Sequence, residues 1–304
     1  MFFYLHIPFC RQKCLYCKFA LTSRFDDLKI ETYVRAMKRE IWDFLDAHPH
    51  VTVESIYFGG GTPSILSSSQ IAKILEVFRT HSFSSIIEIT MEANPEDITP
   101  GYLEAISALG VNRLSLGVQT LNDQALATVG RSPSSVAMRA LDTLVCGPIE
   151  NISLDLIAGL PHVKKGQILS DLGTIFDHIT PKHVSIYMLE DEAYPSDWIA
   201  SLPGEEAIRE EYLSGMNYLQ ERGFRRYELS NFGQACYESR HNRAYWNHSE
   251  SRGFGLSAAS FVGGVRSTNS ASFSGYYRHD VIQDGTLSEE SLRIERIMFG
   301  MRTA

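Results

Sequence analysis

The sequence predicts an α/β fold, a partial (β/α)6 barrel of the triosephosphate isomerase type that is followed by an α+β extension. Six short runs rich in β-branched and aromatic residues are each followed by a segment with helical periodicity, which is typical of β/α units around a parallel sheet. Polar residues and glycines gather where these strands end, as the active face of such a barrel requires. Periodicity alone also fits an open doubly wound sheet, but the placement of these residues favours the partial barrel.

The predicted strands follow one another at residues 2–7, 55–58, 86–91, 113–118, 152–157 and 184–188. The clearest helix comes after the first strand, where apolar residues recur at helical spacing from Ile30 to Leu45. The residues that mark the strand ends are Cys10, the glycines 59–61, Glu92, Gln119, Asp155 and Glu190.

After about residue 195 the alternation of strands and helices stops. We predict a helix at 204–222, a strand at 225–229 and then a stretch at 231–277 that is rich in glycine, serine and aromatic residues. A last helix is expected to begin near Thr286, because Thr286 and Glu289 have the spacing of a capping box. The expected parts are therefore the barrel at 1–195, the α+β extension at 196–285 and, at 286–304, the start of a truncated helical domain.

Composition and charge exclude several classes of protein. The 304 residues carry 36 acidic and 28 basic side chains, a formal net charge of -8, which argues against a broad nucleic-acid surface because such a surface needs clustered Lys and Arg. No run approaches the roughly 20 apolar residues of a membrane span, and no basic region precedes the first apolar stretch, as a secretory signal would require. The expected compartment is the cytoplasm.

Three of the five cysteines form a compact motif, Cys10, Cys14 and Cys17, with the spacing C-x3-C-x2-C in a loop after the first strand. Thiolates at these intervals suit an iron–sulfur cluster or zinc. Three cysteines on a four-iron cluster would leave one iron open to a small molecule. A structural zinc site would need a fourth ligand, for which His6 is a candidate, and unrelated free thiols are the third alternative. The spacing favours the cluster.

Several motifs in this order resemble the radical S-adenosylmethionine (SAM) superfamily. Beyond the cysteine motif these are residues 4–10 (YLHIPFC), 57–64 (YFGGGTPS), 91–95 (MEANP), 114–120 (LSLGVQT) and 155–161 (DLIAGLP). Within the superfamily they resemble the group that contains oxygen-independent coproporphyrinogen III oxidase and the heme chaperone HemW. The resemblance runs from residue 4 to about residue 302.

The resemblance implies a 4Fe–4S cluster on the three cysteines, with SAM bound to the open iron and cleaved by one electron to a 5′-deoxyadenosyl radical. It also implies a set of residues around SAM, namely Tyr4, Tyr16, Gly60, Gly61, Thr62, Glu92, Gln119, Arg131 and Asp155. Taken singly, the glycines also fit an ordinary tight turn, and the polar residues also fit the rim of a barrel. As a set at the strand ends, they favour a SAM site.

Two features separate the members of this group. The oxidase pattern has a further cysteine two residues after the third cluster cysteine, where this chain has Phe19. The chain also has H-N-x-x-Y-W at His241, Tyr245 and Trp246, a motif of HemW-like proteins that is implicated in heme binding. The imidazole could ligate heme iron and the rings could pack on a porphyrin. The alternative is a core or capping histidine beside buried aromatic residues.

The resemblance therefore implies a protein that binds heme and transfers it to acceptor apoproteins, including respiratory proteins at membranes. The alternative is an oxygen-independent coproporphyrinogen III oxidase, an oxidoreductase that decarboxylates propionate side chains, and a zinc-stabilised binding module is a third interpretation. Whether the protein is an enzyme stays open. If SAM is cleaved, an electron donor is required, and the sequence leaves a homodimer open.

Overall fold

A computed structural model describes residues 1–81, 87–190, 194 and 196–303 of the chain. Its six parallel strands confirm the predicted α/β architecture and run in sequence order through the sheet. They are β1 (Phe2–Ile7), β2 (Ser55–Gly60), β3 (Glu88–Ala93), β4 (Arg113–Gln119), β5 (Asn151–Ala158) and β6 (His183–Met188). The third strand was predicted to begin at residue 86, which lies outside the described residues, as does residue 195 at the expected end of the barrel.

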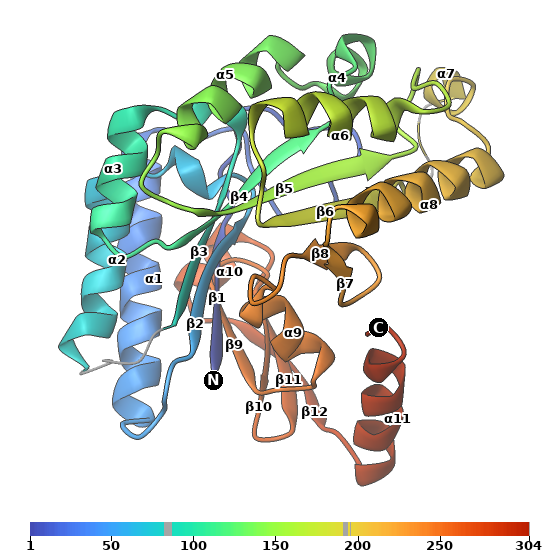
Figure 1. The fold of residues 1–304 in the computed structure, drawn as a ribbon. Coiled ribbons are helices and arrows are strands. Elements are labelled where there is room, and N and C mark those ends of the chain that lie inside the picture. Colours follow the sequence, from blue (N-terminus) through green and yellow to red (C-terminus); the bar gives the residue numbers. More distant parts are fainter. Residues whose placement is uncertain (82–86, 191–193, 195, 304) are drawn as a thin grey trace.

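The barrel is partial because β1 and β6 each pair with a strand from the C-terminal third of the chain. Strand β9 (Ser251–Phe254) runs parallel to β1, whereas β8 (Asn231–Gly233) runs antiparallel to β6. In the described part of the chain the sheet order is β12-β11-β10-β9-β1-β2-β3-β4-β5-β6-β8-β7. The extension thus continues the sheet of the barrel at both edges (Figure 1).

Helices cover the outer face of the curved sheet (Figure 1). They are α1 (Asp27–Ala47), α2 (Ser68–Thr80), α3 (Pro100–Ala108), α4 (Asp123–Val129), α5 (Ser134–Val145), α6 (Gln167–His178), α7 (Ser196–Ile199) and α8 (Glu205–Glu221). Helix α1 begins where the Asp26 carboxylate accepts a hydrogen bond from the Lys29 backbone N–H at 2.8 Å. Its predicted apolar stripe is buried, and each large aliphatic side chain contributes about 1.5–3 kcal/mol on burial.

The C-terminal third contains more regular structure than the sequence indicated. It comprises β7 (Arg225–Arg226), β8, α9 (Arg240–Trp246), β9, β10 (Ala259–Val262), β11 (Val265–Asn269), α10 (Phe273–Tyr277), β12 (Val281–Thr286) and α11 (Glu289–Gly300). The predicted strand at 225–229 is wrong beyond Arg226, where the chain turns before β8. The predicted capping box is also wrong, because Thr286 ends β12 and the Ser288 hydroxyl caps α11 through the Ser291 N–H at 3.1 Å.

Helix α9 packs at the amino ends of the barrel strands, opposite the active face. The Glu88 carboxylate, at the start of β3, accepts hydrogen bonds from the Ser239 hydroxyl at 3.3 Å and from the backbone N–H groups of Arg240 at 3.0 Å and His241 at 3.2 Å. An anion at this end of a helix satisfies its free N–H groups. This cap directs the His241 side chain into the barrel interior, where it reaches Ser55 of β2.

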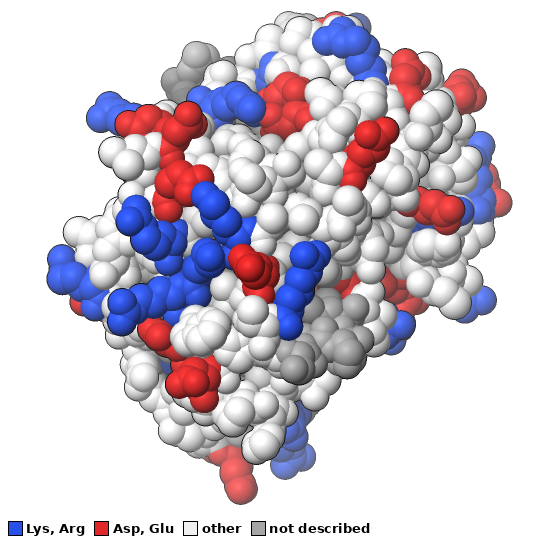
Figure 2. All heavy atoms as spheres, turned by 90° about the vertical axis from the view of Figure 1, so that its left-hand side faces the viewer, with Lys and Arg blue, Asp and Glu red and all other residues white. Residues whose placement is uncertain are grey.

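The outer face over α1 and α2 carries both signs of charge (Figure 2). A groove there is lined by charged residues and Trp42. Lys73 pairs with Glu31 at 2.8 Å, and Arg39 lies 3.7 Å from Asp43. Within the groove basic side chains predominate, with Arg35, Lys38, Arg39 and Lys73 against Glu31. Among the described helices, none is long and apolar enough to cross a lipid bilayer.

Candidate functional site

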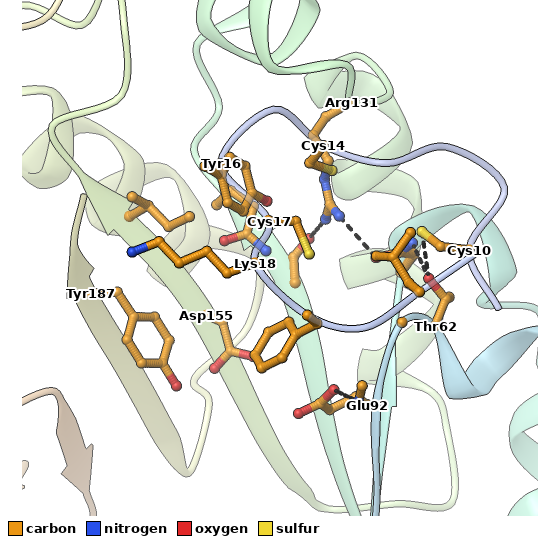
Figure 3. A pocket seen from close by; sticks show the side chains of 18 of the residues that line it. Cys10, Cys14, Tyr16, Cys17, Lys18, Thr62, Glu92, Arg131, Asp155 and Tyr187 are labelled. Atoms are coloured by element: carbon orange, nitrogen blue, oxygen red, sulfur yellow. Dashed lines mark hydrogen bonds between the residues drawn. The ribbon is translucent and has the colours of Figure 1, made fainter. Parts of the chain in front are cut away.

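A cavity of about 490 Å³ opens at the carboxyl ends of the barrel strands, beneath the cysteine loop. Figure 3 shows the cysteines on one side of it and Glu92 and Asp155 on the opposite wall. The predicted residues that line it are Cys10, Cys14, Tyr16, Cys17, Gly60, Gly61, Thr62, Glu92, Gln119, Arg131 and Asp155. Glu190, which was predicted to mark the end of the sixth strand, also lines it, two residues after β6 ends at Met188.

The three cysteines are free thiols on one loop, with Cys10 and Cys14 each 7% exposed. The Thr62 hydroxyl donates a hydrogen bond to Cys10 Sγ at 3.2 Å, so the turn after β2 touches the loop directly. Burial raises the pKa of Cys17, and the nearby sulfurs of Cys14 and Cys10 raise it further. Three sulfurs that face one enclosed space suit a shared inorganic centre better than isolated thiols do.

The zinc alternative lacks a ligand set in this arrangement. His6 is 4% exposed, its Nε2 lies 2.7 Å from the Ala20 carbonyl oxygen, and its Nδ1 lies 3.1 Å from the Tyr4 hydroxyl. Both ring nitrogens are therefore engaged. Within residues 1–81, 87–190, 194 and 196–303, no three His, Cys, Asp or Glu side chains are set to hold a single metal ion.

The glycine turn after β2 packs tightly under the cysteine loop. Gly60 has φ +114°, and a Cβ there would stand 2.6 Å from the His6 ring. At Gly61 a Cβ would stand 2.6 Å from the Phe9 carbonyl oxygen. Glycine is needed for the turn itself, and the same turn forms one wall of the cavity. The tight-turn interpretation is confirmed, and the SAM-binding role of these glycines stays a prediction.

Two buried carboxylates, Glu92 and Asp155, lie on the wall opposite the cysteines. Glu92 accepts hydrogen bonds from the Tyr57 hydroxyl at 2.8 Å and from the Gly60 N–H at 3.1 Å, and burial raises its pKa to about 7. Asp155 accepts from the Ser115 hydroxyl at 2.9 Å through Oδ2, whereas its buried Oδ1 has no partner. Burial raises the pKa of Asp155 as well. An orphaned acceptor in a cavity wall is suited to a ligand that donates hydrogen bonds.

Arg131 and Gln119 lie near the cysteines on the same side of the cavity. The Arg131 guanidinium donates to Asn94 Oδ1 at 2.9 Å and to the Gly117 carbonyl oxygen, and it also faces Cys14 (Figure 3). Gln119 adopts φ 68° where the register of β4 shifts. A left-handed glutamine is uncommon, and such backbone conformations cluster at functional sites.

Several residues that line this cavity were not predicted from the sequence. They are Lys18, Asn94, Ser115, Gly117 and Tyr187. Ser115 and Tyr187 lie within predicted strands, and the inward alternation of strand side chains was the signal that could have indicated them. Tyr4, by contrast, was predicted and does not line the cavity. Its ring lies below the floor, stacked on Tyr57 with 6.1 Å between the ring centroids.

A second cavity of about 730 Å³ lies beside the first, between the end of β6, α8, the β7–β8 region and α9. The two cavities share residues 187–190 at the end of β6. Tyr245 and Trp246 line the second cavity, and the buried Trp246 Nε1 has no hydrogen-bond partner. Arg226 and Arg302 also face this cavity.

The structure places His241 away from this cavity, at 1% exposure in the barrel interior. Its Nδ1 lies 2.8 Å from the Ser55 hydroxyl and its Nε2 lies 3.1 Å from the Tyr245 hydroxyl. Its ring stacks on Tyr57 with centroids 4.9 Å apart. Burial lowers the pKa of His241 to about 3, so the imidazole is neutral. The expectation that His241 offers a free imidazole to a ligand is therefore not met here, because both nitrogens are already bonded.

Comparison with known proteins places the chain in a family. The Radical SAM superfamily matches residues 4–174. The heme chaperone HemW of Lactococcus lactis is 32% identical over 311 residues, which cover 98% of this chain and 80% of that protein. HemW of Synechocystis is 35% identical over 288 residues, which cover 90% and 69%.

A likeness in structure extends over almost the whole chain. Coproporphyrinogen III oxidase (HemN) from Escherichia coli, a radical SAM enzyme, superposes with a TM-score of 0.85 over 99% of this chain and 75% of that chain. The two sequences are 21% identical, so this likeness shows the fold alone. With three cysteines on one cavity and HemW relatives matched over most of its length, the chain belongs to the radical SAM superfamily and, within it, to the HemW family.

Proposed function

We propose that this protein binds a 4Fe–4S cluster and SAM in the cavity at the strand ends, and that it binds heme in the second cavity and passes it to acceptor proteins. The observation that carries the proposal is the pair of adjacent cavities with different linings. Sulfurs, carboxylates and a guanidinium line the first, whereas the second is lined by aromatic and aliphatic side chains, by Arg226 and Arg302, and by Glu190, Glu205 and Glu228. The relatives named heme chaperones support the choice of heme.

The residues around the first cavity fit the cluster and SAM. Cys10, Cys14 and Cys17 would hold the cluster, which when bound supplies an open iron and a single electron. The unpartnered Oδ1 of Asp155 would accept a hydrogen bond from a ribose hydroxyl, and Glu92 would accept one from the SAM ammonium group. Arg131 would hold the SAM carboxylate.

The second cavity fits a flat, largely apolar molecule with acidic side groups. Tyr245 offers a ring face for a porphyrin. The Arg302 guanidinium stacks 4.4 Å from the centroid of the Trp246 ring, and the unpartnered Trp246 Nε1–H can donate a hydrogen bond. Arg226 and Arg302 are suited to the two propionates. This combination of apolar walls and a few convergent polar groups is typical of cofactor sites.

The coproporphyrinogen oxidase alternative has less support. Phe19, where the oxidase pattern has a cysteine, is 60% exposed at the mouth of the first cavity. The likeness to HemN concerns the fold and carries no argument about activity. We therefore propose a carrier that receives heme and gives it to heme-free proteins, respiratory ones included. It would work in the cytoplasm, where its five free cysteines stay reduced, with an electron donor if SAM is cleaved.

The pKa of Glu92 leads to a prediction for SAM binding. Because this pKa is raised to about 7, the carboxyl takes up a proton as the pH falls through that value and loses its attraction for the SAM ammonium group. SAM affinity should then fall by about tenfold per pH unit below about 7. Calorimetry on anaerobic, cluster-loaded protein between about pH 6 and pH 8 measures this. Glu92→Gln should bind SAM weakly with a flat profile, and an unchanged slope in that variant would contradict the assignment.

The proposed function is tested by measuring two activities on one sample. The protein is reconstituted anaerobically with iron and sulfide, given SAM and a reductant, and assayed for heme binding and for decarboxylation of coproporphyrinogen III. We expect stoichiometric heme binding, transfer of that heme to a heme-free acceptor, and no decarboxylated product. Decarboxylated product in stoichiometric amounts would instead establish the oxidase.

A further inference from the structure

We propose that Tyr245, and not His241, is the side chain that ligates the iron of bound heme, and that His241 is a positioning residue for the Tyr245 hydroxyl. This assignment rests on the proposed function, because it concerns the heme cavity. It departs from the sequence motif, in which the histidine is the obvious ligand.

His241 has no lone pair available to a ligand in the second cavity. Its side chain is 1% exposed, Tyr57 covers one face of its ring, and Ser55 and Tyr245 occupy its two nitrogens. To reach iron, the imidazole would have to give up both hydrogen bonds and leave the barrel interior. Buried polar groups that lose their partners cost about 1–3 kcal/mol each, so this movement is unfavourable.

Tyr245 lies between His241 and the cavity. It is 37% exposed and lines the cavity, while its hydroxyl lies 3.1 Å from His241 Nε2. Residues 241 and 245 are one helical turn apart on α9, which puts them on the same face. The three hydrogen bonds to Glu88 fix the start of this helix. The position of the phenol is therefore set by a rigid, buried frame.

A phenolate is a known ligand of heme iron, as in catalase. On ligation of ferric heme, the O–H bond of Tyr245 breaks, its proton passes to solvent water in the cavity, and an O–Fe bond forms while the iron stays ferric. Neutral His241 then donates its Nε2–H to the phenolate oxygen, and its Nδ1 accepts from the Ser55 hydroxyl. Such a second partner orients the ligand and stabilises its charged form.

Tyr187 provides an internal comparison. It lines the same cavity and is 41% exposed, but its hydroxyl faces Asp155 of the neighbouring strand β5 and Ser185 of its own strand. Burial raises the pKa of both phenols, and the Asp155 carboxylate raises that of Tyr187 further by like-charge repulsion. No imidazole is bonded to the Tyr187 hydroxyl. Of Tyr187 and Tyr245, Tyr245 is the one whose phenolate would have an imidazole, that of His241, in hydrogen-bond contact.

The test is resonance Raman spectroscopy of ferric heme bound to the full chain, with excitation into the tyrosinate-to-iron charge-transfer band. We expect tyrosinate modes in the wild type and in Tyr187→Phe, and their loss in Tyr245→Phe together with a fall in heme affinity of more than about tenfold. His241→Gln keeps a hydrogen-bond donor, so it should keep the modes at a shifted frequency, whereas His241→Ala should weaken heme binding.

Other results would overturn the assignment. Tyrosinate modes that persist in Tyr245→Phe, or that vanish in Tyr187→Phe, would contradict it, as would a histidine-ligated spectrum that is lost only in His241→Ala. Tyrosinate modes in the wild type establish a tyrosine ligand, and the Tyr187→Phe and Tyr245→Phe variants show which tyrosine it is. Heme that binds to the wild type without tyrosinate modes would overturn this assignment alone, whereas a wild type that binds no heme would overturn the proposed function as well.

Discussion

Cys14→Ser is expected to abolish the iron–sulfur cluster. A serine hydroxyl is a hard, weakly acidic ligand that does not replace a thiolate on iron. Cys14 is 7% exposed and faces the Arg131 guanidinium, so no other cysteine can take its position from the surface. After anaerobic reconstitution, the variant should contain little iron and sulfide per chain and should lack the visible absorption of a cluster.

Cys146→Ser is the matched control for this experiment. Cys146 is an exposed thiol that ends α5, outside the cavity. This variant should take up as much iron and sulfide as the wild type does. A Cys14→Ser protein that keeps its full iron content would contradict the ligand assignment and, with it, the proposed SAM site.

Glu40→Ala is expected to lower the free energy of unfolding by about 3–5 kcal/mol, because it breaks a buried ion pair and strips its other partners. The Glu40 carboxylate joins α1 to the C-terminal strands. It accepts hydrogen bonds from the Arg252 guanidinium at 2.7 Å, the Asn269 side-chain amide at 2.8 Å, the Gly255 N–H at 2.9 Å and the Tyr276 hydroxyl at 2.8 Å. Chemical denaturation measures the loss.

Glu76→Ala provides the comparison for Glu40, because Glu76 is an exposed glutamate on the neighbouring helix α2. Surface substitutions of this kind change the free energy of unfolding by within about 0.5 kcal/mol. Equal stability of the two variants would show that the carboxylate does not hold the extension against the barrel.

The barrel was predictable because its pattern is local. Each of the six strands carries its own run of β-branched and aromatic residues, and the first was predicted with the bounds that β1 has. Strand β9 is different, since it is four residues long and is stabilised by pairing with β1 some 250 positions earlier. The role of Glu40 could not be predicted from the local sequence either. Its sequence neighbours suggest a solvent-facing helix position, whereas its partners come from residues 252–276.

In the site, too, the residues in local motifs were predictable and those whose environment comes from distant parts of the chain were not. The cysteine spacing and the strand-end residues were readable from the sequence, and the structure brings all but Tyr4 of the predicted cluster and SAM residues to one cavity. For His241 the sequence left a heme ligand and a core histidine both open, and the structure places it in the core. Its burial depends on Ser55, Tyr57 and Glu88, which lie on other strands and surround it only in the folded chain.

We propose that one chain holds SAM and heme at the same time, in two separate cavities. Heme is titrated into cluster-loaded protein, and bound SAM is quantified at each step. We expect one heme to bind per chain while SAM stays bound, because the cavities share only a short wall at residues 187–190. Release of SAM in proportion to the heme added would show that both compete for a single site and would rule out two separate cavities.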